Sequence, residues 1–378
     1  MTRYRRACYV SRMLPGLVPS APAATLALER RFPALTGRLP RRPLACLPTA
    51  VHQLTRLGLA NLWIKRDDQT GLVYGGNKVR KLEWLLAEAL ARGHRTVLTT
   101  GALGSNHALA TTIYARELGL RTELVLVPQP ITAHVRRTLL LDHAYGATIH
   151  LASGVPAAVR GVIGRLLRGV ATRDRPYFIP TGGSSPLGTL GFVNAGLELA
   201  EQVADGAVPE PAAIVAPLGS GGTVAGLVAG LKLAGLGTRV IAIRVSDVMA
   251  PPPARLARLA RQALAQLARL GAGPLAVDVG ADDFDVRGEW LGTGYGAVTV
   301  EAEEAQRRIA AREDLHLEAT YGAKALAALF VIAREPAWRD RPLLFWHTYS
   351  AVDPGAALGR LPDWHTLPQP LHRFFTPR

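Results

Sequence analysis

The sequence predicts an α/β protein built on mostly parallel sheets. Short runs rich in β-branched residues alternate with helical stretches, and several of these runs end in a glycine-rich turn that opens a helix. This alternation is typical of parallel strands covered by helices. At 378 residues, 48% of them hydrophobic and 19% charged, the chain has material for one large domain or two ordinary ones.

The individual elements follow from these runs. Strands, some of them entering glycine turns, are predicted within residues 95–100, 121–127, 147–152, 177–183, 212–222, 239–245 and 341–348. Helices are predicted at 79–90, 107–119, 157–170, 223–235 and 255–270. Ligands of such sheets bind at the carboxyl ends of strands, on the loops that enter helices, and the glycine turns occupy those places.

The net charge of +15 raises the question of nucleic-acid binding. Residues 1–45 carry +8, from nine arginines and Glu29, and the other 333 residues carry +7. That surplus is scattered, without interleaved aromatic residues or a known reader motif, so no specific nucleic-acid partner is expected. Two cysteines, Cys8 and Cys46, imply no disulfide framework. No apolar run reaches the roughly 20 residues of a membrane span.

The first 40 residues are rich in Arg, Pro and Ala and have no clear period. We expect a poorly ordered N-terminal extension over residues 1–39. An organelle-targeting leader is the alternative.

Lysine is scarce, because 39 of the 44 basic residues are arginine and five are lysine. Two of the five lysines lie in one stretch, GLVYGGNKVRKLEWLLAEAL (71–90). A desolvated lysine can lose its proton and attack a carbonyl, which arginine cannot do. Taken alone, Lys78 is equally explained as a solvated lysine in the first turn of a helix.

The stretch PLGSGGTVAG (217–226) follows a predicted strand and opens a predicted helix. Its glycines let backbone amides converge, which indicates a phosphate cradle at a helix N-terminus. A close-packed strand–helix turn is the alternative. The stretch is neither a P-loop nor a G-x-G-x-x-G motif.

Two other glycine turns add polar groups. In TGALGSNHALAT (100–111), Ser105 and Asn106 are good helix caps, and the free amides beside them could hold a carboxylate. Tyr295 and Tyr321 also stand in glycine contexts, where single tyrosines are usually structural. Together, a scarce lysine, a phosphate cradle, a carboxylate-binding turn and loop tyrosines describe a pyridoxal phosphate site.

The wording and order of these stretches resemble the fold-type II pyridoxal phosphate enzymes of the 1-aminocyclopropane-1-carboxylate deaminase and D-cysteine desulfhydrase family. The matching stretches, between about residues 40 and 355, are KRDDQTGLVYGGNKVRKLEWLLAEAL, GALGSNHALAT, IPTGGSSPLGTLGF, GSGGTVAGL, GTGYGAVT, EATYGAKAL and LLFWHT. The resemblance implies a tryptophan synthase β-like fold, with two open, twisted, mostly parallel sheets and helices on both faces.

The resemblance also implies roles for individual residues. Lys78 would carry pyridoxal 5'-phosphate as a Schiff base, and Lys81 with the turn Gly219, Ser220, Gly221, Gly222 and Thr223 would bind its phosphate. Asn106 would bond the ring 3-oxygen, and Thr348 would approach the ring nitrogen. Ser105, with the amides of Asn106 and His107, would receive the substrate carboxylate. Ser105, Tyr295 and Tyr321 would act in catalysis, and no metal is implied.

Five positions depart from the family pattern. They are Gly104 in place of Gln, Leu109 in place of Arg, Gly322 in place of the Glu of the deaminase branch, and Tyr349 with Ser350 in place of Gly-Gly. Without an acid at the ring nitrogen the electron sink is weaker. That favours α-proton removal and β-elimination over opening of a cyclopropane ring.

The predicted function is therefore a cytoplasmic pyridoxal phosphate lyase or deaminase that acts on a small amino acid, by α,β-elimination with release of ammonia and a 2-oxo acid. The alternatives are cyclopropane-amino-acid ring opening, another biosynthetic use of the site, a non-catalytic cofactor-binding protein and an Arg-rich nucleic-acid binder. A homodimer is expected. We predict a large domain from residues 40–82 and 180–362, a small domain from 83–179, and a tail over 363–378.

Overall fold

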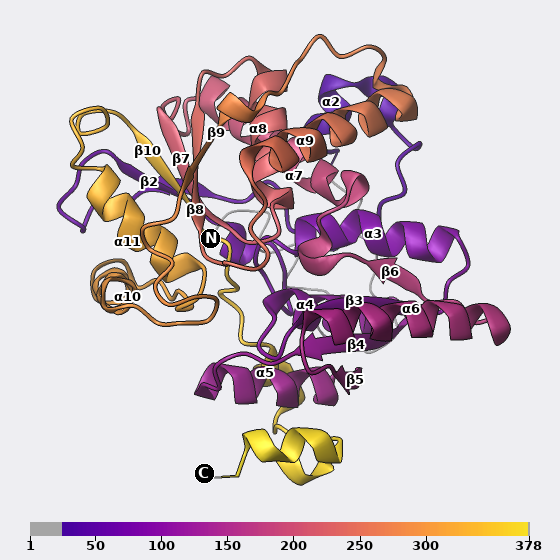
Figure 1. Ribbon diagram of the computed structural model, residues 1–378. Helices are drawn as coiled ribbons and strands as arrows, with labels where there is room; N and C mark the ends of the chain where they lie inside the picture. Colours follow the sequence, from indigo (N-terminus) through magenta and orange to yellow (C-terminus); the bar gives the residue numbers. More distant parts are fainter. Residues whose placement is uncertain (1–24, 377–378) are drawn as a thin grey trace.

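The computed structural model describes residues 25–376, which form two mostly parallel sheets covered by helices, so the predicted fold class is confirmed (Figure 1). The helices are α2 (Ala27–Arg31), α3 (Val79–Ala91), α4 (Asn106–Glu117), α5 (Ala133–Ala144), α6 (Val155–Ala171), α7 (Pro186–Ala204), α8 (Gly222–Ala234), α9 (Pro253–Leu267), α10 (Val300–Glu313) and α11 (Gly322–Ile332).

The larger sheet has the strand order β1-β2-β10-β7-β8-β9. Its strands are β1 (Val51–Gln53), β2 (Leu62–Lys65), β7 (Ala213–Leu218), β8 (Arg239–Arg244), β9 (Phe284–Arg287) and β10 (Leu343–Trp346). Only β1 runs antiparallel to its neighbour. Along β10, Leu344 and Trp346 pack with α7, α8 and α9, whereas Leu343 and Phe345 pack with α10 and α11. Helices therefore bury both faces, as a parallel sheet requires.

The smaller sheet has the order β5-β4-β3-β6 and is parallel throughout. Its strands are β3 (Thr96–Ala102), β4 (Arg121–Val127), β5 (Thr148–Leu151) and β6 (Tyr177–Ile179). Helices α4 and α5 cover one face and α6 the other. The C-terminal 3-10 turns η8 (Trp364–Thr366) and η9 (Gln369–Phe374) lie beside α5, where Leu367 and Leu371 are buried (Figure 1).

The N-terminal part of the described chain packs onto the helices of the larger sheet, beginning earlier in the sequence than predicted. Leu28 is fully buried, and its amide donates to Oδ1 of Asn194 on α7 at 3.0 Å. Leu35, in a following 3-10 turn, is also fully buried. The poorly ordered extension expected over residues 1–39 is therefore wrong for residues 26–35. The leucine side chains of this segment are buried, and α2 packs against α7. Residues 1–24 of that expectation lie outside the described part of the chain.

Three strands escaped sequence analysis: β1, β2 and β9. Each is three or four residues long and includes a polar or charged residue, whereas the equally short β6 and β10 are wholly apolar and were predicted. In addition, β1 and β9 lie at the edges of the larger sheet, and β9 carries Asp285 and Arg287. Edge strands bury less side-chain surface and therefore tolerate charge.

The predicted domain division stays a prediction. The boundary at 82/83 falls inside α3, which runs without a break from Val79 to Ala91 and packs along α7. A boundary after Ala91 would leave that helix whole.

Candidate functional site

One cavity collects the predicted site residues from the loops at the carboxyl ends of strands in both sheets. Of those residues, the ones that line it are Lys78, Lys81, Ser105, Asn106, His107, Gly219, Ser220, Gly221, Thr223, Tyr295, Tyr321 and Thr348. Gly222 is not among the residues that line the cavity. Sequence spacing could not show that residues as far apart as Lys78 and Thr348 meet here; the parallel topology brings the strand ends together.

The turn before Lys78 is held by backbone contacts with neighbouring strands. Gly76 has a φ of +91°, and a Cβ there would stand 2.6 Å from the carbonyl oxygen of Thr348. The amide of Gly76 donates to the carbonyl of Asp67 at 2.9 Å, and the amide of Asn77 donates to that of Thr348 at 3.1 Å. Only glycine fits this left-handed, close-packed position.

The side chain of Lys78 is half-buried, and its desolvated amine is linked to the phosphate-type turn. Its Nζ donates to Oδ1 of Asn77 at 2.9 Å, and Nδ2 of Asn77 donates to Oγ1 of Thr223 at 3.0 Å. Burial lowers the pKa of Lys78 from 10.5 to about 8, although the negative charge of Glu318 opposes the change. A sizeable neutral fraction therefore exists near neutral pH, as a nucleophilic amine requires.

Lys81 and the first turn of α8 form a region suited to an anion. Nζ of Lys81 donates to the carbonyl of Gly182 at 3.1 Å, and burial together with the charge of Lys78 holds its pKa well below the usual value. Within residues 25–376, neither lysine has an ion-pair partner. A Cβ on Gly222 would come within 3.1 Å of Lys81 Nζ and 2.7 Å of Ser184 Oγ. The helix N-terminus adds a favourable field for negative charge.

One expected donor of that turn is occupied. The amide of Gly222 donates to Oγ of Ser184 at 3.0 Å, and Ser184 also bonds the hydroxyl of Ser220 at 2.8 Å. The phosphate-binding role of Gly222 stays a prediction. Its missing side chain lets Ser184 and Lys81 approach the helix start closely.

Ser105, Asn106 and His107 stand at the start of α4. Oγ of Ser105 caps the helix by accepting from the amide of Ala108 at 3.3 Å, and Oδ1 of Asn106 accepts from the hydroxyl of Tyr74 at 3.3 Å. The His107 ring bonds Thr99 at 3.1 Å. Burial and the charges of Lys78 and Lys81 hold the pKa of His107 well below its usual value, so the ring is neutral.

The two tyrosines share a hydrogen bond. The hydroxyl of Tyr321 donates to that of Tyr295 at 2.9 Å, and the Tyr321 ring centre lies 6.0 Å from Nζ of Lys78. Burial raises the pKa of Tyr295 to about 12 and that of Tyr321 well above its usual value. Both hydroxyls are therefore protonated at neutral pH and can donate.

Sequence analysis missed one charged group, Glu318. It is the carboxylate that lines the cavity among the described residues, and it accepts from the amides of Thr320 at 2.8 Å, Tyr321 at 2.8 Å and Gly322 at 2.6 Å. Burial raises its pKa despite these bonds. Glu318 stands three residues before the N-cap Tyr321, where capping rules predict no acid. It begins the stretch EATYGAKAL that carries the family resemblance, and that is the signal that could have found it.

The positions that depart from the family pattern divide into two groups. Tyr349 and Ser350 line the cavity, and Oγ of Ser350 accepts from the amide of Gly75 at 2.7 Å. Leu109 lies in the core, and the amide of Gly104 donates to Oε1 of Gln129 at 3.0 Å. Of the departing positions, Tyr349 and Ser350 are therefore the ones that line the cavity.

Comparison with known proteins places this site in context. A family model described as pyridoxal-phosphate dependent enzyme matches residues 43–348. The chain is 36% identical over 324 residues to a D-cysteine desulfhydrase of Salmonella paratyphi C, covering 83% of this chain and 95% of the relative. It is 34% identical over 321 residues to a putative 1-aminocyclopropane-1-carboxylate deaminase of Pyrococcus horikoshii, covering 83% and 93%.

Two further matches are a relative named for a different activity and a solved structure. A nocardicin C-9' epimerase of Nocardia uniformis subsp. tsuyamanensis is 34% identical over 339 residues, covering 86% of this chain and 97% of the relative. A crystal structure of an ACC deaminase homologue superposes with a TM-score of 0.70 at 32% identity, covering 84% of this chain and 93% of that one. The resemblance and the cofactor predicted from the sequence are confirmed.

Proposed function

Because this chain belongs to the family of pyridoxal-phosphate dependent enzymes, we propose that it is a lyase for a small amino acid. The reaction is α,β-elimination with release of ammonia and a 2-oxo acid, as predicted from the sequence. The observation that carries the proposal is the buried Lys78 amine, with its lowered pKa, in a cavity lined by the hydroxyls of Ser105, Tyr295 and Tyr321.

The residues of the cavity fit pyridoxal phosphate. Lys78 supplies an amine that can condense with the aldehyde. Lys81, without an ion-pair partner in the described residues, and the N-terminus of α8 suit the phosphate, and the absent side chain of Gly222 lets the Lys81 amine lie close to that helix end. Asn106 would bond the ring oxygen through its amide, and Thr348 would stand at the ring nitrogen.

The bound cofactor supplies an electron sink for negative charge at the substrate α-carbon. Ser105 and the amides of Asn106 and His107 bind the substrate carboxylate and so fix which α-bond faces the amine. With the cofactor bound, Nζ of Lys78 would accept the α-proton. The protonated hydroxyls of Tyr321 and Tyr295 donate a proton to the leaving group.

Epimerisation at the α-carbon is a second candidate. It needs one group that removes the α-proton and another that returns a proton to the opposite face. The Tyr295–Tyr321 hydroxyl pair is a proton-holding unit separate from Lys78, and a relative matched over most of its length is named an epimerase. Ring opening of a cyclopropane amino acid, as the name of another relative indicates, is the remaining alternative.

A single experiment separates elimination from epimerisation. D- and L-amino acids are incubated with the purified protein in deuterium oxide. Elimination releases a 2-oxo acid and ammonia, whereas epimerisation returns the amino acid with inverted configuration and deuterium at the α-carbon. Lys78→Ala should abolish both. An amino-acid pool that stays unchanged for every candidate, with the parent protein carrying its cofactor, would contradict the proposal.

We further propose a homodimer and a cytoplasmic location. One face of α6 exposes five apolar residues spaced three or four apart, Val155, Val159, Ile163, Leu167 and Val170, which is a surface that a second subunit could cover. The low cysteine count is compatible with a reducing compartment. None of the helices in the described chain has the length and apolar character needed to cross a bilayer. Light scattering of the parent protein and of an Ile163→Glu variant tests the dimer.

A further inference from the structure

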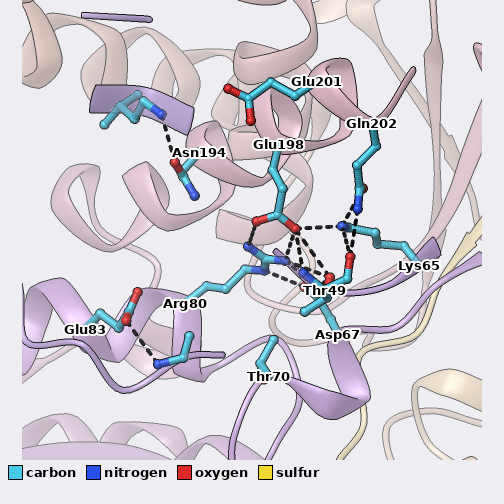
Figure 2. Close-up of polar contacts among 12 residues, drawn as sticks. Thr49, Lys65, Asp67, Thr70, Arg80, Glu83, Asn194, Glu198, Glu201 and Gln202 are labelled. Atoms are coloured by element: carbon cyan, nitrogen blue, oxygen red, sulfur yellow. Dashed lines mark hydrogen bonds and ion pairs between the residues drawn. The ribbon is translucent and has the colours of Figure 1, made fainter. Parts of the chain in front are cut away.

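Figure 2 shows a buried ionic network that includes Arg80, which follows Lys78 by two residues in the sequence. It consists of Lys65 on β2, Asp67 in the 3-10 turn η3 (Asp67–Gln69), Arg80 on α3 and Glu198 on α7. Their side chains are at most 3% exposed. Two positive and two negative charges cancel, so the network as a whole is neutral.

Arg80 is the centre of this network. Its Nε and Nη2 donate to the two oxygens of Asp67 at 2.9 and 2.7 Å, and its Nη1 and Nη2 donate to the two oxygens of Glu198 at 2.9 Å each. The planar fork of arginine suits such paired contacts, and the point charge of lysine does not. Burial alone would raise the pKa of Glu198, but Arg80 and Lys65 hold it well below the usual value.

Each carboxylate has further donors from other elements. Asp67 accepts from Nε1 of Trp346 on β10 at 2.8 Å and from the hydroxyl of Thr49 at 2.9 Å. Glu198 accepts from Nζ of Lys65 at 2.6 Å. Because every charged group in the network is bonded, the position of Arg80 is determined from several sides at once.

The first turn of α3 needs such an anchor. It carries the amines of both Lys78 and Lys81, yet the helix dipole and the charge of each amine disfavour cations at this end. The helix start has no side-chain cap. The network holds the turn on both sides of Lys78, through the Arg80 side chain and through the carbonyl of Asp67, which accepts from the amide of Gly76.

We propose that Arg80, held by Asp67 and Glu198, is a positioning residue that fixes the amines of Lys78 and Lys81 for cofactor attachment. The neutral network leaves the charges of the two amines uncompensated, so they remain available to the cofactor phosphate. The inference rests on the proposed function, because it assumes that Lys78 is the lysine to which the cofactor attaches.

The test compares Arg80→Lys with Arg92→Lys. Both are conservative changes on α3, but Arg92 lies at the opposite end and forms an exposed pair with Glu88 at 2.6 Å. The dissociation constant of pyridoxal phosphate is measured on each apoprotein by equilibrium dialysis. Arg80→Lys should raise it roughly 10- to 100-fold, as loss of a supporting contact typically does, and Arg92→Lys should leave it unchanged.

A milder variant covers the case in which Arg80→Lys does not fold. Trp346→Phe replaces the buried indole by a smaller phenyl ring and removes one donor to Asp67. The small cavity that it leaves costs some stability, which the melting temperature of the apoprotein reports. The substitution should weaken cofactor binding several-fold and slow borohydride-trapped labelling of Lys78. A purely structural role would lower the melting temperature of the apoprotein without changing either quantity in folded protein.

The outcomes distinguish the positioning role of Arg80 from the proposed function of the protein. If folded Arg80→Lys or Trp346→Phe protein binds and traps the cofactor like the parent, the positioning role is wrong while the proposed function stands. If the parent protein is labelled at a lysine other than Lys78, the proposed function itself fails.

Discussion

The hydroxyl of Tyr321 donates to the hydroxyl of Tyr295 across 2.9 Å and so joins the start of α11 to the loop that follows β9. The rings meet edge to face with centres 5.9 Å apart. Since burial keeps both hydroxyls protonated, the pair can pass a proton along one hydrogen bond to a substrate beside Lys78.

Tyr321→Phe tests that role. The substitution removes one hydroxyl and keeps the ring, so cofactor absorbance should hardly change. Turnover of the best substrate should fall about 10²- to 10⁴-fold, the usual contribution of a positioned acid or base. In Tyr295→Phe, turnover of the same substrate should fall less if Tyr321 is the group nearer the substrate. Full activity in both variants, measured by 2-oxo acid release, would rule out the pair as a proton donor.

Ser105→Ala should act mainly on substrate binding. Ser105 caps α4 through the amide of Ala108 and is assigned to the substrate carboxylate. Its loss should raise KM more than it lowers kcat, and loss of the cap should reduce the free energy of unfolding by about 1 kcal/mol. Thr299→Ala, which removes the equivalent cap of α10 far from the cavity, is the control. An unchanged KM would show that the carboxylate is bound elsewhere.

The lowered pKa of Lys78 gives a pH signature. Only the neutral amine reacts with an acylating reagent, so trace labelling of the apoprotein followed by peptide mapping should show Lys78 reactivity rising with a midpoint near pH 8. The sign for stability follows from the same values. Between about 8 and 10.5 the unfolded chain binds more protons at Lys78 than the folded one. The apoprotein should therefore gain stability as pH rises through that window.

Lys78→Met removes this contribution. Its apoprotein should lack the gain that the parent shows over the same window in chemical unfolding. A parent curve that falls there as steeply as the variant curve would contradict the assigned burial effect.

Gly222→Ala should weaken cofactor binding. The new Cβ would stand 2.7 Å from Ser184 Oγ and 3.1 Å from Lys81 Nζ, and this is closer than side chains normally approach. The change displaces the amine that would meet the phosphate, so we expect the cofactor dissociation constant to rise about tenfold or more. Gly164→Ala, also in a helix but with open space around it, is the control. Equal affinities would place the phosphate away from this turn.

Sequence patterns predicted the parts of this protein that depend on long local runs. Strands such as β4 and β7 are predicted by continuous apolar runs, because both faces of a parallel sheet are buried. Helices such as α6 are predicted by apolar residues that recur with the helical period, because one face is buried. The short strands β1, β2 and β9 were missed because each includes a polar or charged residue, whereas β6 and β10, equally short, are wholly apolar. Leu28 and Leu35 were missed because two buried side chains in an Arg-rich segment change its average composition little.

The candidate site was predicted residue by residue through the family resemblance, not through spacing. What the sequence could not show is how side chains pair. Examples are the bond of Ser184 to the amide of Gly222, the contact of Asn77 with Thr223, and the fourfold bonding of Arg80. Such contacts join residues separated by tens to more than a hundred positions and arise only when the sheets bring their loops together.

Glu318 offers the sharpest test of the electrostatics of the cavity. Its carboxylate accepts three backbone amides at the start of α11, and its negative charge favours the protonated form of Lys78. In Glu318→Gln one oxygen can still serve Tyr321 and Gly322, but the side-chain amide group would face the amide of Thr320, donor against donor. The lost bond should reduce the free energy of unfolding by about 1 to 3 kcal/mol.

The charge change has a separate readout. Without the carboxylate, the protonated amine of Lys78 loses a favourable partner, so its pKa should drop below that of the parent. In the trace-labelling experiment, the midpoint for Lys78 should then move to lower pH in Glu318→Gln. Glu301→Gln, an exposed acid in the first turn of α10, should leave the midpoint in place. If the Lys78 midpoint stays at the parent value in folded Glu318→Gln protein, Glu318 does not influence the amine, and its role is confined to holding the turn of Tyr321.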